Sequence, residues 1–323
     1  MEKIEKLTVS ASPHLHSGAS TQRIMLDVLI ALCPALIASA VIFGLRVLAL
    51  CAVCVAAAVL AEYISRRAMK RPNTVADLSA AVTGLLLAFN LPPGLPFWMA
   101  AIGSVAAVVA VKQMFGGIGQ NFINPALAGR IILLISFPSA MSKWSEPLGW
   151  RGGLDALSGA TPLEALANSG ALPGKWEMLL GIRGGALGEV CIIALVLGGV
   201  YLILRKVISP VIPLCYTGTV ALVMLIAGRG DLNYVFYQLC GGGLVLAAVF
   251  MATDYTTSPI DIKGRIIFGI GCGLLTALIR LFASLPEGAS FSVIIMNILV
   301  PHIERLTTPK PFGFVKSGKG DGS

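Results

Sequence analysis

Long apolar runs separated by short polar segments follow one another along almost the whole chain of 323 residues. A helix that crosses a bilayer needs about 20 apolar residues. The pattern therefore predicts an all-α integral membrane protein with about ten transmembrane helices. The third, fifth and tenth runs are short and interrupted by Pro, Gly or Asn, so we expect broken or re-entrant helices there. The candidate spans are 24–44, 47–64, 76–91, 96–112, 124–139, 186–204, 209–227, 235–252, 264–283 and 290–303.

Composition favours a membrane protein over a soluble one. Hydrophobic residues make up 56% of the chain and charged residues only 12%, whereas soluble domains are about 25% charged. The net charge of +8 is compatible with nucleic-acid binding, but the basic residues form short clusters between apolar runs. Such clusters are typical of cytoplasmic loops that face anionic lipid. We therefore expect the lipid bilayer, and no nucleic acid, as a partner. The polar first 23 residues also predict no cleavable signal peptide.

The distribution of Lys and Arg predicts the orientation of the chain and its division into two halves. The loops that would share a side with the N-terminus carry most of the basic residues, which places both termini in the cytoplasm. The five segments that follow from this are a cytoplasmic N-terminal segment (1–23), a first membrane half (24–139), an extracytoplasmic loop (140–185), a second membrane half (186–303) and a cytoplasmic tail (304–323). Five spans in each half would run in opposite directions, which predicts two inverted repeats of five helices.

The long loop carries the sharpest motif of the chain, Asp155-Ala-Leu-Ser158-Gly159-Ala160-Thr161-Pro162-Leu-Glu164. Small residues leave the Thr161 hydroxyl accessible, and the following proline keeps the backbone of Thr161 extended. The same residues are typical of a helix start. Thr161 would then be the N-cap, Pro162 the first helical residue and Glu164 the third, as in a capping box. The two interpretations are compatible.

The motif D-x-x-S-G-A-T resembles the site recognised by bacterial FMN transferases, which join the FMN phosphate to a threonine hydroxyl as a phosphoester. Further segments resemble the family that contains the D subunit of the Rnf electron-transport complex and the B subunit of the sodium-translocating NADH:quinone reductase. The short N-terminal region is more similar to the Rnf protein. These segments include Ser12-Pro13-His14, Asp77-Leu-Ser79, Leu91-Pro92-Pro93, Lys112-Gln-Met-Phe115-Gly116-Gly117-Ile-Gly119-Gln-Asn121, Asn124-Pro125-Ala126 and Met251-Ala-Thr253-Asp254.

The resemblance implies a membrane subunit of a sodium- or proton-translocating ferredoxin:NAD oxidoreductase complex in a bacterial cell membrane. It implies a flavoprotein, and through the phosphoester a phosphoprotein, with FMN on Thr161 and the residues Asp155, Ser158, Gly159 and Ala160 as the surrounding recognition motif. A second, non-covalent flavin such as riboflavin is expected in the membrane part. The implied partners are an FMN transferase and the other Rnf subunits, including a second covalent-FMN subunit and iron–sulfur subunits. Neither a catalytic residue for a substrate nor a metal site is expected in this chain.

Charged and polar residues inside or beside apolar runs are further candidates, since their burial in a bilayer is costly unless they have a role. The phosphate on Thr161 could be neutralised by Lys143, Arg151, Lys175 or Arg183. The glycine-rich stretch from Gly116 to Gly119 could bind the second flavin, or it could pack membrane helices closely. Other such residues are Asp27, Glu62, Asn121, Asn124, Arg130 and Asp254.

Two other classes of protein fit the apolar pattern. An inverted-repeat channel or secondary transporter would have polar sites near the middle of the bilayer and would need no flavin. A structural subunit would need no cofactor at all. The D-x-x-S-G-A-T motif argues against both, because neither class requires it.

Overall fold

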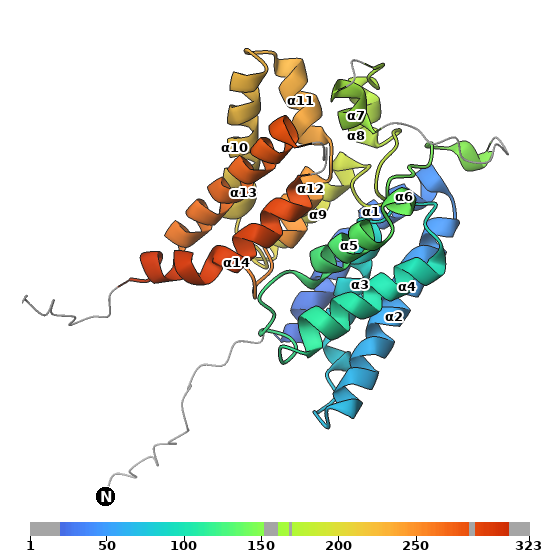
Figure 1. The fold of residues 1–323 in the computed structure, drawn as a ribbon, viewed down its shortest axis with the longest axis vertical. Helices are drawn as coiled ribbons and strands as arrows, with labels where there is room; N and C mark the ends of the chain where they lie inside the picture. Colours follow the sequence, from blue (N-terminus) through green and yellow to red (C-terminus); the bar gives the residue numbers. More distant parts are fainter. Residues whose placement is uncertain (1–19, 152–160, 168–169, 284–287, 310–323) are drawn as a thin grey trace, which may run out of the picture.

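The computed structural model describes residues 20–151, 161–167, 170–283 and 288–309, and this part of the chain is all-helical, with fourteen α-helices (Figure 1). Four helices are long and apolar enough to cross a membrane: α1 (Thr21–Phe43), α2 (Arg46–Ala68), α13 (Ile262–Phe282) and α14 (Ala289–Thr307). A fifth span is formed if α11 (Leu232–Cys240) is joined to Leu244–Met251, which is bent against it by 62°. The chain is therefore a multi-pass membrane protein.

Five shorter apolar helices account for the remaining predicted spans. They have 10–17 residues, so by length alone they do not establish full crossings, and the count of about ten spans stays a prediction for them. All ten predicted apolar runs nevertheless coincide with a helix or a helix pair. The shorter helices are α3 (Ser79–Phe89), α4 with the following π-helix η2 (Phe97–Gln113), α5 (Pro125–Ser136), α9 (Ile192–Leu204) and α10 (Val211–Ala227).

Two interruptions lie elsewhere than the sequence predicts. The tenth run is predicted to be broken, but α14 is one continuous helix of 19 residues with Pro301 inside it. A proline removes a single backbone hydrogen bond, which a long, well-packed helix tolerates. The eighth run is predicted to be one helix, but it breaks between α11 and α12 (Leu244–Leu246). Gly242 and Gly243 adopt positive φ angles of 63° and 65° at this break, a conformation that glycine takes without strain.

Two pairs of helices join the two halves of the chain. The first half meets the second where α1 contacts α9 and where α5 contacts α14. Within the halves, α2 packs on α3 and α4, and α10 packs on α13. Glycines allow close approaches of this kind, since a Cβ atom at Gly198 of α9 would collide with the backbone oxygen of Ala31 in α1. Small residues at helix contacts are typical of membrane bundles.

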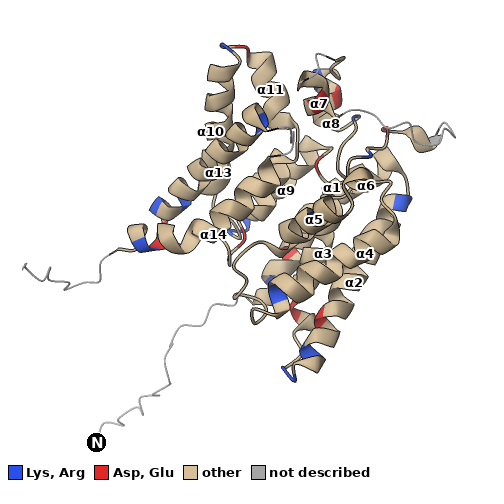
Figure 2. Cartoon of the chain, viewed as in Figure 1, with Lys and Arg blue, Asp and Glu red and all other residues tan. Residues whose placement is uncertain are grey.

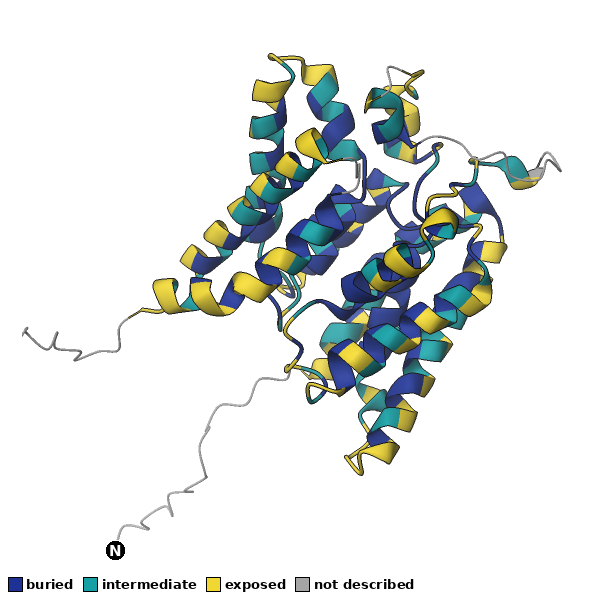
Figure 3. Ribbon diagram, viewed as in Figure 1, coloured by how far each residue is buried: buried dark blue, intermediate teal, exposed yellow. Residues whose placement is uncertain are grey.

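The outer surface and the helix ends match a bilayer environment. Large apolar side chains such as Ile37, Leu60 and Leu197 are exposed, and exposed positions recur along the helices of the bundle (Figure 3). Charged residues gather at the helix ends and are sparse along the helix middles (Figure 2). In water so large an apolar surface would drive association, whereas lipid chains cover it without cost.

The loop between the halves forms short elements at one end of the molecule. These are α6 (Pro138–Met141), the 3-10 helix Gly149–Arg151, α7 (Pro162–Ala167) and α8 (Lys175–Leu180) (Figure 1). The loop is fixed to the bundle near the end of α1, where the amide of Leu148 donates to the carbonyl oxygen of Ile42 at 2.8 Å. This end therefore holds the predicted flavin-bearing segment.

Candidate functional site

Thr161 begins α7 in the geometry of a capping box. Its amide donates to Glu164 Oε2 at 3.0 Å, and the amide of Glu164 donates back to Thr161 Oγ1 at 3.3 Å. The structure thus confirms the predicted helix start at Pro162. The expected accessibility of the Thr161 hydroxyl is not found in this structure, because Thr161 is buried, with 5% of its surface exposed, and its Oγ1 caps α7. The remaining motif residues, Asp155, Ser158, Gly159 and Ala160, lie outside the described residues.

A cavity of about 300 Å³ lies beside the start of α7. Leu163 fixes α7 against the broken helix, since its side chain fills the space that a Cβ atom at Gly241 would need. Arg183 is the only basic residue on the cavity wall as described, and only 4% of its surface is exposed. The cavity is lined by Pro162, Ala165, Ala171, Leu172, Pro173, Arg183 and Gly184.

The four basic residues considered for the phosphate are therefore not equivalent. Lys143 and Lys175 are exposed, and Arg151 ends the 3-10 helix Gly149–Arg151. Arg183 instead donates through Nη2 to the carbonyl oxygen of Glu189 at 2.8 Å and through Nη1 to Met178 Sδ at 3.7 Å. Burial lowers the pKa of the Arg183 guanidinium, and the Glu189 carboxylate opposes this shift. An arginine stays charged at neutral pH even so, because its ordinary pKa is above about 12.

Two more arginines, the buried Arg130 and the half-buried Arg280, support backbone or polar groups of the neighbouring helices. Arg280 of α13 donates to the carbonyl oxygens of Gly241 and Gly242 at 3.0 Å and 3.4 Å. Arg130 of α5 donates to Asn90 Oδ1 at 3.0 Å and to Ser290 Oγ at 2.8 Å. The predicted intramembrane charge Arg130 is thus a link between the two halves of the chain.

A larger cavity of about 470 Å³ lies at the other end of α9. Arg183 lies in the segment before the start of α9, whereas Leu202, near the last turn of α9, lines this larger cavity. Apolar side chains make up most of the wall, including Ile24, Val82 and Phe250. Polar groups on the wall come from Ser79, Thr83, Lys112, Asn121, Asn124, Thr253 and Asp254. A mostly apolar cavity with a few converging polar groups is the usual form of a small-molecule site.

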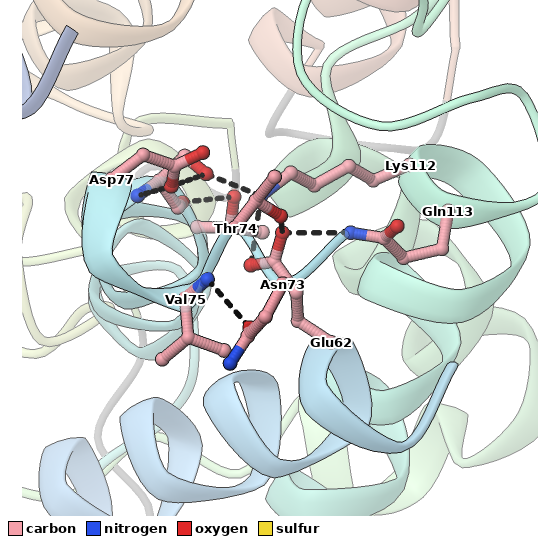
Figure 4. Close-up of polar contacts among 9 residues, drawn as sticks. Glu62, Asn73, Thr74, Val75, Asp77, Lys112 and Gln113 are labelled. Carbon is pink, nitrogen blue, oxygen red and sulfur yellow. Dashed lines mark hydrogen bonds and ion pairs between the residues drawn. The ribbon is translucent and has the colours of Figure 1, made fainter. Parts of the chain in front are cut away.

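A buried polar network supports one wall of this cavity (Figure 4). Lys112 Nζ lies 3.2 Å from Glu62 Oε2 and donates to Ser79 Oγ at 2.6 Å. The other carboxylate oxygen, Glu62 Oε1, accepts from Thr74 Oγ1 and from Gln113 Nε2, each at 2.8 Å. Both oxygens of the carboxylate are therefore hydrogen-bonded, and the ammonium group is held at the cavity wall. In the sequence Lys112 is the last residue of the fourth apolar run and begins the glycine-rich segment, and nothing there indicates its pairing with Glu62.

The glycine-rich stretch contributes to the same cavity and also packs closely on a helix, because a Cβ atom at Gly117 would collide with the Arg66 guanidinium of α2. Ile118 and Gly119 line the wall, and a Cβ atom at Gly119 would meet nothing within 4 Å. Asn124 caps α5, since its Oδ1 accepts from the amides of Ala126 and Leu127. Its Nδ2 donates to the carbonyl oxygen of Met251 at 3.3 Å, which ties the two halves together.

Besides Glu62, the two remaining acidic candidates, Asp27 and Asp254, have different surroundings. Asp27 is buried and paired, because Tyr201 donates to it at 2.9 Å and Arg205 at 3.2 Å. Asp254 lines the larger cavity and accepts from Thr256 and Thr257 at 3.2 Å and 3.4 Å. Burial raises the pKa of the Asp254 carboxyl, and these hydrogen bonds oppose the shift. Of the two, only Asp254 is placed where a small molecule or an ion in the cavity would meet it.

Fold and sites together define an α-helical, multi-pass membrane protein with two mostly apolar cavities whose walls carry a few polar side chains. The chain belongs to the NQR2, RnfD, RnfE family, whose model matches residues 8–313. It is 46% identical over 318 residues to the D subunit of the Na⁺-translocating ferredoxin:NAD⁺ oxidoreductase complex of Acetobacterium woodii, covering 97% of both chains. It is 42% identical over 323 residues to the proton-translocating counterpart of Clostridium ljungdahlii, covering 95% of this chain and 96% of that one. The D subunit of the ion-translocating oxidoreductase complex of Stutzerimonas stutzeri is 39% identical, with 93% and 94% covered.

Proposed function

We propose that the chain is the D subunit of an ion-translocating ferredoxin:NAD⁺ oxidoreductase complex, in which it relays electrons within the membrane. The full-length similarity to three proteins of that name supports this role. The partners are the other subunits of the complex, including a second covalent-FMN subunit and iron–sulfur subunits. The coupling ion is left open, since one relative is named for sodium and another for protons.

FMN joined to Thr161 through a phosphoester is the cofactor of this relay. The observation that carries the proposal is the position of Thr161, a hydroxyl residue that ends the motif D-x-x-S-G-A-T and begins α7. The described residues fit the group, because a cavity with a buried arginine lies beside the residue that follows Thr161. FMN supplies one-electron transfer chemistry, while the protein fixes its position and surrounding charge. A covalent tether also keeps the flavin at high local concentration near its partners.

Flavin fluorescence of the denatured chain tests the proposal directly. After co-expression with an FMN transferase, the wild-type chain should remain fluorescent in a denaturing gel, and its intact mass should include one esterified FMN. A wild-type chain without flavin, despite an active transferase, would contradict the proposal.

The second, non-covalent flavin is assigned to the cavity of about 470 Å³. The apolar side chains of Ile24, Val82 and Phe250 suit an aromatic ring system, and Lys112 and Asn121 provide hydrogen-bond donors at its edge. A positive charge close to a flavin favours electron uptake. The Glu62 carboxylate, which is turned to Lys112, holds that charge in place.

The inverted repeat and the orientation are also proposed. One arrangement that occurs in both halves supports the repeat. In each half, a basic residue near the end of the fourth apolar run donates a hydrogen bond to the third run, at its helix start in the first half and at its helix break in the second. Lys112 donates to Ser79, the first residue of α3, and Arg280 donates to Gly241 and Gly242 between α11 and α12. In this arrangement both termini are cytoplasmic and Thr161 is extracytoplasmic, as the Lys and Arg distribution requires.

The backbone at these two positions is alike as well. Leu78, which precedes α3, has a φ of 63° and a ψ of 3°. Gly243, which precedes α12, has a φ of 65° and a ψ of 12°. Each half also contains a π-helix, η2 (Ala107–Gln113) and η4 (Ala247–Met251), and such wide turns often occur at functional sites.

A further inference from the structure

The guanidinium group of Arg183 has hydrogen-bonding capacity that its protein neighbours do not use. A guanidinium has five N–H donors and no acceptor. In the described part of the chain, Nη2 binds one backbone carbonyl, Nη1 meets only the weak acceptor Met178 Sδ, and Nε has no partner. A buried donor without a partner costs about 1 to 3 kcal/mol, and more when it is charged. Arg183 is nevertheless buried on the wall of the cavity beside α7.

Among the described residues, no carboxylate pairs directly with the Arg183 guanidinium. Glu189 interacts electrostatically with Arg183 and with the half-buried Arg280. The Glu189 side chain accepts from the amide of Ala186 at 3.0 Å, and no ion pair within 4.0 Å joins it to Arg183 in the described structure. The Arg183 guanidinium therefore keeps its charge and unused donors without a contacting carboxylate, which favours an anion beside it.

Of the three arginines, Arg183 alone lines the cavity beside α7. Arg280 is occupied by backbone oxygens at the helix break, and Arg130 by Asn90 and Ser290. The cavity wall also includes Pro162, whose amide nitrogen is bonded to Thr161. An anion attached to the Thr161 side chain is therefore tethered one residue from the wall that presents Arg183.

We propose that this cavity is an anion subsite in which Arg183 binds the phosphodiester of the FMN on Thr161 and so positions the flavin. The inference rests on the proposed function. The phosphodiester keeps one negative charge and two free oxygens, and the planar guanidinium fork suits such a group better than an ammonium does. Arg183 is a positioning residue here: it holds the tether, it limits the flavin to one side of α7, and its charge favours electron uptake by the flavin.

The first arm of the test needs no flavin. The Thr161→Ala chain is purified, and its unfolding temperature is followed as inorganic phosphate is added, with sodium chloride of equal ionic strength as the reference. Phosphate should stabilise this chain, because a ligand that binds only the folded state raises stability. Adding the substitution Arg183→Gln should weaken the binding of phosphate about tenfold or more, which is the effect of losing one charge-assisted hydrogen bond. Arg229→Gln, an exposed arginine on the α10–α11 loop, should leave it unchanged.

The second arm uses the flavin-loaded complex. Arg183→Gln should retain covalent flavin in the denatured chain but shift the midpoint potential of that flavin to a more negative value, while Arg183→Lys, which keeps the charge and the fold, should shift it less. An unchanged potential in Arg183→Gln, or phosphate stabilisation that survives this substitution, would overturn the subsite while the covalent flavin stands. Absence of covalent flavin on the wild type would instead overturn the proposed function, and with it the occupant named for the subsite.

Discussion

The ammonium nitrogen of Lys112 lies 3.2 Å from Oε2 of Glu62, and both side chains are buried between α2 and η2. Fifty residues separate the two in the chain. A buried pair of this kind contributes little net stability, because desolvation offsets most of its attraction, but removing one partner leaves an uncompensated charge. The pair therefore has consequences for both stability and cavity chemistry.

Removing one member of this pair should be more damaging than removing both. Lys112→Met or Glu62→Gln should each lower the free energy of unfolding by about 3 to 5 kcal/mol. The double variant should recover part of that loss, because no buried charge is left alone. Unfolding in mixed detergent micelles measures the difference. Lys70→Met, at an exposed position after α2, is the matched control and should have almost no effect. Additive losses in the double variant would show that the two charges do not interact.

Filling the larger cavity should remove the non-covalent flavin alone. Val82→Trp places an indole on the cavity wall, where it would compete with a ring system for the same space. The covalent flavin should persist, because Thr161 lies beyond the opposite end of α9. Flavin released by denaturation is separated from flavin that stays on the chain, and each is quantified. Ile37→Trp, on the exposed face of α1, should release as much flavin as the wild type. Release of a wild-type amount of flavin from Val82→Trp would show that the second flavin binds elsewhere.

The orientation can be tested with reporter fusions. Fusions after Lys70 and after Lys206 should report the cytoplasm, since basic loops remain on that side. A fusion at Ser169 should report the extracytoplasmic side. These three positions lie in different connections between helices. If one of the intervening helices did not cross the membrane, the sides that the fusions report would differ from the predicted pattern. A cytoplasmic signal at Ser169 would place the Thr161 segment on the wrong side for the proposed relay.

Much of the fold could be predicted from apolar run length. The ten runs coincide with helices or helix pairs because every backbone group in a bilayer must be hydrogen-bonded within its own segment. The helix breaks are harder to predict. Gly241–Gly243 is visible in the sequence as a possible break, yet run length alone includes it in one span. Leu78 carries no such signal, because a leucine with φ of 63° is held in that conformation by its tertiary surroundings.

The site residues likewise divide into those that the local sequence predicts and those whose contacts depend on the tertiary fold. The capping box at Thr161 is local, so Thr161, Pro162 and Glu164 are placed correctly from four consecutive positions. The pair Lys112–Glu62 is not local, and a single sequence contains no record of which distant side chains meet. Arg183 is one of four basic residues that could serve the phosphate, and its burial distinguishes it from the exposed Lys143 and Lys175.

Thr161 itself combines a structural and a chemical role, and substitutions can separate the two. Thr161→Ala removes both the cap and the hydroxyl that forms the phosphoester. Loss of the cap costs about 1 kcal/mol, which is small for a bundle of this size, so the variant should insert and fold. Glu164→Ala removes the other half of the capping box but keeps the hydroxyl. It should therefore be destabilised to a similar extent and still carry FMN.

Intact mass and in-gel fluorescence of these chains, each co-expressed with an FMN transferase, give the decisive comparison. Wild type and Glu164→Ala should carry one esterified FMN, and Thr161→Ala should carry none. Thr161→Ser keeps a hydroxyl and should retain partial labelling. Asp155→Ala should slow attachment through recognition by the transferase, so its labelling should approach that of the wild type with longer exposure to the enzyme. Because only a side chain with a hydroxyl can form the ester, covalent flavin that survives denaturation of Thr161→Ala would place the linkage at another residue.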